Sequence, residues 1–223
     1  MRAQARAQAS EGYVIVYGAS GHGKVVADIL LACGTEVEGF VDDDSLKCAQ
    51  VSDQKILGDA TWLAEQATRQ PIAVALGIGD NFARRAVAER CVAIGARLLT
   101  AVHPTAAIAP SAKVSSGVVV MAHAVVNPDA VIGQGAIINT AAIVEHDCNV
   151  GKFAHLSPKV AIGGHVQVGD LSWLGIGSTV IPNIKVGTGS IIGAGATLLH
   201  DVDDWVVAVG TPARILKELE RRI

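Results

Sequence analysis

The sequence lacks several features that would each assign the protein to a class. It has no run of Lys or Arg and its formal net charge is −3, which excludes the basic surface that nucleic acids and anionic membranes bind. No apolar run approaches the roughly 18 residues that a transmembrane helix needs. The four cysteines have neither metal-ligand nor disulfide-framework spacing, which indicates reduced thiols in a cytoplasmic protein and no metal site.

Charge is scarce and aliphatic side chains are abundant. Half of the residues are apolar and only 17% are charged, a greasy balance for a soluble protein unless other subunits cover part of its surface. We therefore expect an oligomer. Residues 1–12 begin with a basic segment, MRAQARAQAS, and are expected to form a flexible tail.

An aliphatic residue recurs at every sixth position between residues 108 and 203. Ile, Val and Leu occur 31 times in this stretch, and 16 of them share one of six registers, where chance would place about five. A period of six fits neither a helix nor a flat strand, so it predicts a coil of short straight segments with regular corners. The sixteen positions are Ile108, Val114, Val120, Val126, Ile132, Ile138, Val144, Val150, Leu156, Ile162, Val168, Leu174, Val180, Val186, Ile192 and Leu198.

Small residues and glycines follow the same period. Ala124 and Ser172 are among the small side chains that stand four positions after a repeat aliphatic, where they fit a tight corner. Gly151 and Gly169 are among the glycines directly after one, where a Cβ would be crowded. The pattern resembles the hexapeptide-repeat acyltransferases, whose chains wind a left-handed parallel β-helix of 18-residue coils. The handedness rests on this resemblance, because crossovers between parallel strands are otherwise right-handed.

The region before the repeat alternates predicted strands and helices in the order of a Rossmann-like unit. His103-Pro104 breaks the chain before the first hexad, so we predict an α/β Rossmann-like domain over 13–103 and a β-helix domain over 104–223. The predicted strands are 13–17, 37–41, 72–76 and 97–102, and the predicted helices are a stretch ending at 33, 61–68 and 82–94.

The glycine-rich turn Gly18–Lys24 has several interpretations. It imitates a P-loop, but Val25 stands where Mg²⁺ needs a Ser or Thr hydroxyl. It also imitates a dinucleotide fingerprint, but Ser20 replaces the central glycine. It is otherwise a structural turn with an incidental His22, or a turn whose backbone N–H groups and helix N-terminus receive a phosphorylated ligand.

Two acids and the position of this turn favour the phosphorylated ligand. Asp42 and Asp43 end the second predicted strand, near enough to accept hydrogen bonds from a ribose or base. A GASGHG turn and a double Asp before a hexapeptide coil resemble the sugar acyltransferases typified by bacillosamine-pathway and perosamine N-acetyltransferases and sialic acid O-acetyltransferases, over residues 13–214. In that family the first domain holds a nucleotide-linked sugar. The resemblance assigns this binding to Ser20, Gly21, His22, Asp42, Asp43 and Gly79.

Within the repeat, one histidine stands between two carboxylates. His146 lies between Glu145 and Asp147, and a carboxylate that accepts from one imidazole nitrogen leaves the other as a lone-pair base. We predict His146 as general base, and the family's closely similar E-H-[DE]-C segment supports this prediction. By the same resemblance Asp147 is the preferred partner and Glu145 the second. The candidate catalytic residues are His146, Asp147, Glu145 and Asn139.

The resemblance also assigns a binding site for acetyl-CoA, as co-substrate. It places His155 beside the thioester, although an exposed polar residue on a turn is the alternative. It assigns Gly164, Ile176 and Ala194 to the groove, and the 18-residue coil stacks Gly164 over His146 and Ala194 over Ile176. We interpret the remaining histidines of the repeat region as surface or capping residues: His103, His123, His165 and His200.

The end of the chain resembles the closing segment of the same family, in which a Gly-x-Pro-Ala-Arg turn borders the adenosine end of CoA. Thr211 as N-cap and Pro212 at the first helical position predict a short helix to Ile223 that caps the open end of the coil.

The leading functional hypothesis is transfer of an acetyl group from acetyl-CoA to the 4-amino group of a nucleotide-linked 4-amino-4,6-dideoxy sugar, UDP-linked bacillosamine-type or GDP-perosamine. Such a reaction would serve surface polysaccharide (O-antigen) or glycan synthesis. The alternatives are O-acetylation of a sugar hydroxyl and non-catalytic sugar-nucleotide binding. We expect a cytoplasmic homotrimer with the acetyl-CoA groove shared between neighbouring subunits, and no nucleic acid or membrane insertion.

Overall fold

The fold is given by a computed structural model that describes residues 12–44, 50–51 and 54–221. The chain forms two compact units, Met1–Pro104 and Thr105–Ile223. The predicted tail lies outside the described residues except for Gly12. None of the described helices has the length and apolar character that a membrane crossing requires.

The first unit is a sheet whose strands run in the order β3-β4-β2-β1-β5-β6. From β4 to β6 the neighbours are parallel, while β3 is antiparallel to β4. All five residues of β5 are buried, as expected where helices cover both faces of a parallel sheet. The elements are β1 (Tyr13–Tyr17), α2 (Gly21–Ala32), β2 (Gly39–Val41), β3 (Gln50–Val51), β4 (Gln54–Gly58), α3 (Ala60–Ala67), β5 (Ile72–Leu76), α4 (Asn81–Ala93), β6 (Arg97–Leu98) and β7 (Ala101–Val102).

Three details of the first unit differ from the prediction. The strand predicted over 97–102 is two strands, β6 and β7, separated at Leu99 and Thr100. The strand predicted over 37–41 begins only at Gly39. Strand β4 was not predicted, because its sequence, QKILG, has neither β-branched enrichment nor alternation beyond one isoleucine. The alternating order that indicated a Rossmann-like unit is confirmed.

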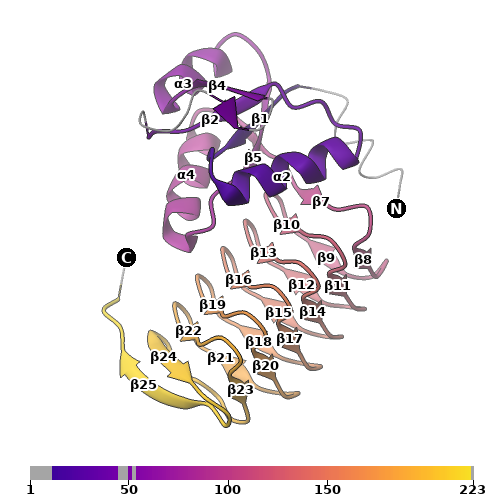
Figure 1. Cartoon of the computed structure of the whole chain (residues 1–223), viewed down its shortest axis with the longest axis vertical. Helices are drawn as coiled ribbons and strands as arrows, with labels where there is room; N and C mark the ends of the chain where they lie inside the picture. Colours follow the sequence, from indigo (N-terminus) through magenta and orange to yellow (C-terminus); the bar gives the residue numbers. More distant parts are fainter. Residues whose placement is uncertain (1–11, 45–49, 52–53, 222–223) are drawn as a thin grey trace. The chain divides into compact units, whose positions relative to one another are not determined.

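The second unit is a stack of coils built from three parallel sheets, here called sheets I, II and III (Figure 1). Each coil contributes one two-residue strand to each sheet in turn. Sheet I holds β10 (Val119–Val120), β13 (Ile137–Ile138), β16 (His155–Leu156), β19 (Trp173–Leu174) and β22 (Ile191–Ile192), followed by β24 (Val206–Val209) and β25 (Arg214–Glu218). Sheet II holds β8 (Ala107–Ile108), β11 (Val125–Val126), β14 (Ile143–Val144), β17 (Ala161–Ile162), β20 (Thr179–Val180) and β23 (Thr197–Leu198). Sheet III holds β9 (Lys113–Val114), β12 (Val131–Ile132), β15 (Asn149–Val150), β18 (Gln167–Val168) and β21 (Lys185–Val186).

Strand register confirms 18 residues per coil. His155 pairs with Ile137 on one side and Trp173 on the other, and the other two sheets keep the same spacing, as between Val125 and Ile143. The repeat aliphatic is the second residue of every two-residue strand, and from Val120 to Leu198 each of these side chains is at most 4% exposed. The predicted hexads therefore form the core of a parallel β-helix.

The corners of the coil depend on backbone conformations that few residues adopt. Residues six apart repeatedly have a positive φ, as at Asp147 (59°), Phe153 (55°) and Lys159 (61°). The glycines after the repeat aliphatics are as crowded as predicted: a Cβ at Gly169 would lie 2.5 Å from the backbone nitrogen of Thr188 in the next coil. Such contacts leave no space for a side chain between successive coils.

The predicted C-terminal helix is wrong. Residues 211–213 form a turn, and Arg214–Glu218 forms β25, an antiparallel partner of β24. The end of a parallel sheet presents unpaired backbone groups, and pairing satisfies them. A helix of about a dozen residues without a packed face is marginal in water, so the edge of β24 is the stronger template.

Candidate active site

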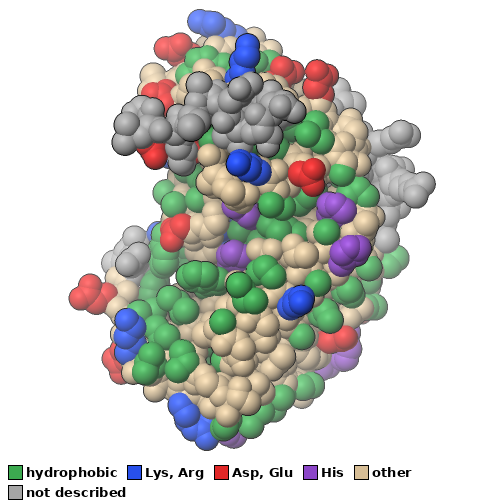
Figure 2. All heavy atoms as spheres, viewed as in Figure 1, with side chains coloured by type: hydrophobic (Ala, Val, Ile, Leu, Met, Phe, Trp, Pro, Cys, Tyr) green, Lys and Arg blue, Asp and Glu red, His purple; other side chains and the backbone are tan. Residues whose placement is uncertain are grey.

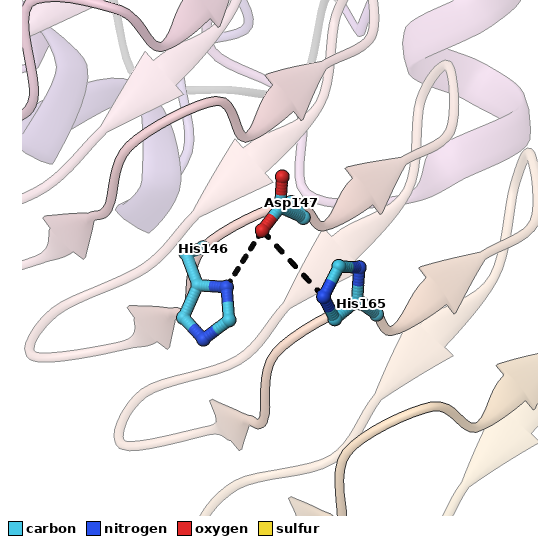
Figure 3. Close-up of side chains that lie close together, drawn as sticks. All are labelled: His146, Asp147 and His165. Carbon is cyan, nitrogen blue, oxygen red and sulfur yellow. Dashed lines mark hydrogen bonds and ion pairs between the residues drawn. The ribbon is translucent and has the colours of Figure 1, made fainter.

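His146 and Asp147 lie in the turn between β14 and β15, at the corner where sheet II passes into sheet III. The left-handed backbone at Asp147 lets its carboxylate turn back to the imidazole beside it. His146 Nδ1 is 2.7 Å from Asp147 Oδ2 (Figure 3). Glu145 has a different role, because its Oε2 accepts from the backbone N–H of His146. Asp147 is therefore the carboxylate that meets the imidazole.

This contact fixes the tautomer of His146. An ionised carboxylate can only accept, so the proton lies on Nδ1 and the lone pair lies on Nε2. The hydrogen bond from His146 holds the pKa of Asp147 below its usual value, which keeps the acceptor ionised at neutral pH. Figure 3 shows the second ring nitrogen of His146 pointing away from Asp147. The side chain is 53% exposed, so a substrate can reach that nitrogen.

Gly164 makes room for the imidazole. It lies one coil beyond His146, and a Cβ there would come within 2.7 Å of both Cε1 and Nε2 of the ring. The imidazole thus lies over the α-carbon of Gly164, as the stacking arithmetic predicted. Gly164 was assigned to the acetyl-CoA groove, but its one printed close neighbour in this structure is His146.

His165, interpreted from the sequence as a surface residue, completes a cluster at this corner. It stands one coil beyond Asp147, and its Nε2 is 3.6 Å from Asp147 Oδ2, outside hydrogen-bond distance. Its ring is perpendicular to that of His146, with the centroids 5.4 Å apart. The signal that would have found it is the 18-residue spacing, applied to Asp147 rather than to His146 alone.

Asn139 and His155 belong to a second cluster. Asn139 Nδ2 is 3.1 Å from His155 Nε2, so the amide predicted to act with His146 contacts the other candidate histidine. The His155 ring is stacked on Trp173, at 6.2 Å between centroids and 13° between planes. Trp173 Nε1 donates to Ser157 Oγ at 2.8 Å. Trp173 was not predicted, although it stands 18 residues after His155.

The two clusters lie at different places around the coil. The chain passes from sheet I to sheet II to sheet III, so the corner that bears His146 is opposite the sheet that bears His155. The packed core lies between them. The predicted groove residues Ile176 and Ala194 are exposed in turns that follow strands of sheet I, and Gly195 donates to Ile176 across one coil. One copy of the chain therefore does not unite His146 with the predicted acetyl-CoA residues.

In the first unit, two glycine-rich turns lie against each other at the carboxyl ends of β1 and β5. A Cβ at Gly18, where φ is +111°, would lie 2.6 Å from the carbonyl oxygen of Gly77, and one at Gly23 would overlap the carbonyl of Gly18. Gly21 and Gly79 differ, because a Cβ at either position would meet no atom within 4 Å. The open side of both turns is thus a place where a ligand can approach the backbone closely.

A buried guanidinium holds the second of these turns. Arg84 is fully buried and donates to the carbonyl oxygens of Ile78 and Gly79 and to Asn81 Oδ1. Burial lowers its pKa to about 9, which still leaves it charged at neutral pH. Burial and then the charge of Arg84 lower the pKa of His22 to about 4, so this imidazole is neutral. Its Nε2 is buried with no hydrogen-bond partner in the described part of the chain.

The two predicted ribose or base acceptors have protein partners. Asp42 accepts from the backbone N–H groups of Ala19 and Asp44. Asp43 accepts from Tyr17 Oη at 2.8 Å, from the backbone of Ala60 at 3.0 Å and from Arg90 Nη2 at 2.8 Å. Each carboxylate oxygen has two lone pairs, so these contacts leave acceptor capacity for a ligand. Their first consequence is to connect β2 with the turn after β1 and the start of α3.

Comparisons with known proteins agree with both halves of this description. Residues 13–91 match the family model described as PglD N-terminal domain, and residues 165–200 match bacterial transferase hexapeptide (six repeats). A variant of perosamine N-acetyltransferase from Caulobacter crescentus, solved with CoA and GDP-perosamine, is 38% identical. That match covers 93% of this chain and 98% of that one, with a TM-score of 0.89. The chain belongs to this hexapeptide-repeat N-acetyltransferase family.

Two further relatives have the same character. The acetyltransferase domain of PglB from Neisseria gonorrhoeae, solved with acetyl coenzyme A, is 36% identical over 93% of this chain and 100% of that one, with a TM-score of 0.87. UDP-N-acetylbacillosamine N-acetyltransferase from Bacillus subtilis is 34% identical over 110 residues, which is 49% of this chain and about half, 51%, of that relative. The resemblance inferred from the turn, the acidic pair and the hexads is confirmed.

We predict that the Asp43 carboxylate stabilises the first unit in a pH-dependent way. Partial burial raises the pKa of Asp43, but hydrogen bonds from Tyr17, Arg90 and Ala60 outweigh it, so the net pKa lies below its usual value. A lowered carboxyl pKa stabilises the fold above the unfolded value of about 3.9 and ceases to do so as the pH falls through the folded value. Asp43→Asn should therefore lower the free energy of unfolding at pH 7 by about 1 kcal/mol, a modest loss because the side chain is 44% exposed.

The measurement is urea unfolding of both proteins at pH 7 and near pH 3.5, with the exposed Asp28→Asn on α2 as control. The difference between wild type and Asp43→Asn should shrink at the lower pH. A difference of equal size at both values would contradict the electrostatic account.

Proposed function

We propose that this protein transfers the acetyl group of acetyl-CoA to the 4-amino group of a nucleotide-linked 4-amino-4,6-dideoxy sugar, for surface polysaccharide or glycan synthesis. The observation that carries the proposal is the His146–Asp147 pair with its exposed Nε2. It stands on a coil whose relative at 38% identity was solved with CoA and GDP-perosamine. Family membership also favours the sugar-nucleotide interpretation of the Gly18–Lys24 turn over a P-loop.

The reaction uses the lone pair on His146 Nε2. The neutral amine of the sugar attacks the thioester carbonyl, and Nε2 removes a proton from the nitrogen as the C–N bond forms. The C–S bond then breaks, the amide is complete, and the imidazolium returns its proton to the departing thiolate of CoA. Asp147 holds the ring and stabilises the imidazolium. A hydroxyl acceptor would be activated by the same base, which is why O-acetylation remains an arm of the test below.

The first unit is proposed to bind the nucleotide-linked sugar at the carboxyl ends of its strands. Ser20, Gly21 and Gly79 offer open backbone beside the N-terminus of α2. The unpartnered His22 Nε2 supplies a polar atom that a ligand can pair with. Asp42 and Asp43 shape the turns and add acceptors at the end of β2.

A shared groove between copies would unite the base with acetyl-CoA. His155, Ile176 and Ala194 are proposed to bind acetyl-CoA on one copy, opposite the corner that presents His146. Exposed apolar side chains are present on both surfaces: Trp173 and Ile176 near sheet I, and Ile181 and Leu199 at the corner of His146 (hydrophobic residues in Figure 2). Because two different surfaces would meet, the contact is head-to-tail, and a ring such as a trimer closes it.

His146→Ala is expected to lower kcat by about 10²–10⁴-fold with little change in the binding of either substrate, because the amine keeps its own nucleophilicity and loses only the proton acceptor. The assay follows CoA release with GDP-linked and UDP-linked 4-amino sugars and with their 4-hydroxyl analogues. Asp147→Asn should cost less than His146→Ala. Turnover of only the hydroxyl analogues would favour O-acetylation, and no turnover with any acceptor would favour a binding protein.

Gly164→Ala is expected to lower kcat by roughly 10- to 100-fold, because the new Cβ would occupy the space of the imidazole and displace it from its working position. The sharp control is the double variant with His146→Ala, where the same glycine change should have no further effect. A raised KM for acetyl-CoA with unchanged kcat would instead make Gly164 a contact of the coenzyme, as the resemblance implies.

Subunit mixing tests the shared groove. His146→Ala and His155→Ala should each be impaired alone, but random co-assembly should restore about one quarter of the sites, in which both residues are intact at one interface. Co-expression with two affinity tags yields the mixed oligomer, and light scattering gives its mass. Failure of mixing to restore activity in verified mixed oligomers, or a monomeric mass, would contradict the proposal.

A further inference from the structure

The corner that bears the proposed base carries three donor groups on two successive coils. His146 and Asp147 come from one turn, and His165 comes from the equivalent turn of the next coil, directly after Asp147 in the stack (Figure 3). Nδ1 of His146 and Nε2 of His165 are directed at the same carboxylate oxygen, at 2.7 and 3.6 Å. All three ligand atoms lie within 4.8 Å of one another.

These distances suit a first-row transition metal ion. Zn²⁺ binds imidazole nitrogen at about 2.0–2.1 Å and carboxylate oxygen at about 2.0–2.2 Å in a tetrahedron, so its ligand atoms stand roughly 3.4 Å apart. The two separations from Asp147 Oδ2 bracket that value, and small side-chain rotations are enough to reach it. The side chains are 44–58% exposed, so an ion can enter from solvent and a water can fill the fourth position.

We propose that His146, Asp147 and His165 form a site for Zn²⁺ or a chemically similar divalent transition metal ion, and that its occupation inhibits the enzyme. The ion is a reversible inhibitor and has no part in the reaction. The inhibition rests on the proposed role of His146 as base, whereas the binding rests only on the donor geometry.

The inhibition follows from the two nitrogens of one ring. In the metal-free state Nδ1 carries the proton and donates to Asp147, which leaves the lone pair on Nε2. An ion bound through Nδ1 takes the lone pair of that nitrogen, so the neutral ring must carry its single proton on Nε2. Nε2 is then a donor and cannot accept a proton from the amine. The ion also occupies the carboxylate that would stabilise the imidazolium.

The donor set predicts selectivity. Two imidazoles and one carboxylate match Zn²⁺, Co²⁺, Ni²⁺ and Cu²⁺, whose affinities rise along the first row. Mg²⁺ and Ca²⁺ require mostly oxygen ligands and should bind poorly. Mg²⁺ is therefore the control ion, at the same concentration and ionic strength.

His165→Asn is the informative variant. Asparagine tolerates the left-handed backbone found at His165, where φ is 59°, and the chain already has Asn183 at the equivalent position of the next coil, with φ 64°. The substitution thus removes an imidazole ligand without demanding a new turn. His200→Ala, an exposed histidine elsewhere on the β-helix, is the matched control.

Isothermal titration of chelator-treated full-length protein with ZnCl₂ tests the site without any assay of turnover. Wild type and His200→Ala should bind one ion per chain, and His165→Asn should bind it at least about 10-fold more weakly. No binding by the wild type, or equal affinity in His165→Asn, would overturn the site.

Turnover tests the consequence. Zn²⁺ should lower kcat of the wild type and EDTA should restore it, while half-inhibition of His165→Asn, normalised to its own metal-free rate, should need at least about 10-fold more Zn²⁺. Mg²⁺ should have no effect. If Zn²⁺ binds with the expected dependence on His165 but turnover is undiminished, the inhibition is overturned together with the assignment of His146 as base, and the metal site stands. If the metal-free enzyme shows no acetyl transfer, the proposed function fails independently of the titration.

Discussion

The stacking of equal coils is the constraint on which the second unit depends. Each two-residue strand is too short to be stable alone, so the coil persists because its backbone groups pair with the coils before and after it at a constant spacing of 18 residues. That spacing excludes side chains at the glycine corners, as at Gly169, and requires a buried aliphatic at every sixth position. A long insertion at most places would break three ladders at once.

The same constraint creates the functional chemistry. Residues 18 apart are forced into vertical columns, so a single turn acquires partners from its neighbours without any long-range loop. His146 obtains its floor from Gly164, and Asp147 obtains a second imidazole from His165. The rigid ladder also keeps the His146–Asp147 hydrogen bond in place at a position that is half exposed, where two free side chains would lose entropy to form it.

The hexads, the 18-residue coil and the alternation of the first unit could be predicted from the sequence because they are periodic or local. The contact between His146 and Asp147 was also predictable, since the two residues are adjacent. What could not be predicted depends on partners far apart in the chain. Asn139 meets His155 because of coil stacking, and Asp43 is held by Arg90, 47 residues away.

The C-terminal segment shows why local signals can fail. A Thr-Pro pair followed by RILKELE is a reasonable helix start, and the competing structure is invisible unless the edge of β24 is already known to be free. Pairing with that edge supplies backbone hydrogen bonds to β25, whereas a helix there would have needed its own apolar face and a surface to cover. Tertiary context therefore overrides propensity at the one place where the repeat ends.

The triangular path of the coil also explains why a base of this kind can be both exposed and effective. A corner opposite the sheet of His155 is far from the groove on its own chain, so the chain alone presents an oriented imidazole to solvent. In a head-to-tail ring that corner would face the sheet I surface of a neighbour, and water would be excluded only when the substrates and both subunits are in place. Until then Nδ1 of His146, Oδ2 of Asp147 and Nε2 of His165 stand open together. The arrangement that leaves Nε2 free for an amine is thus the one that leaves the other three atoms accessible to a metal ion, because both properties come from placing the base on an outer corner of the coil.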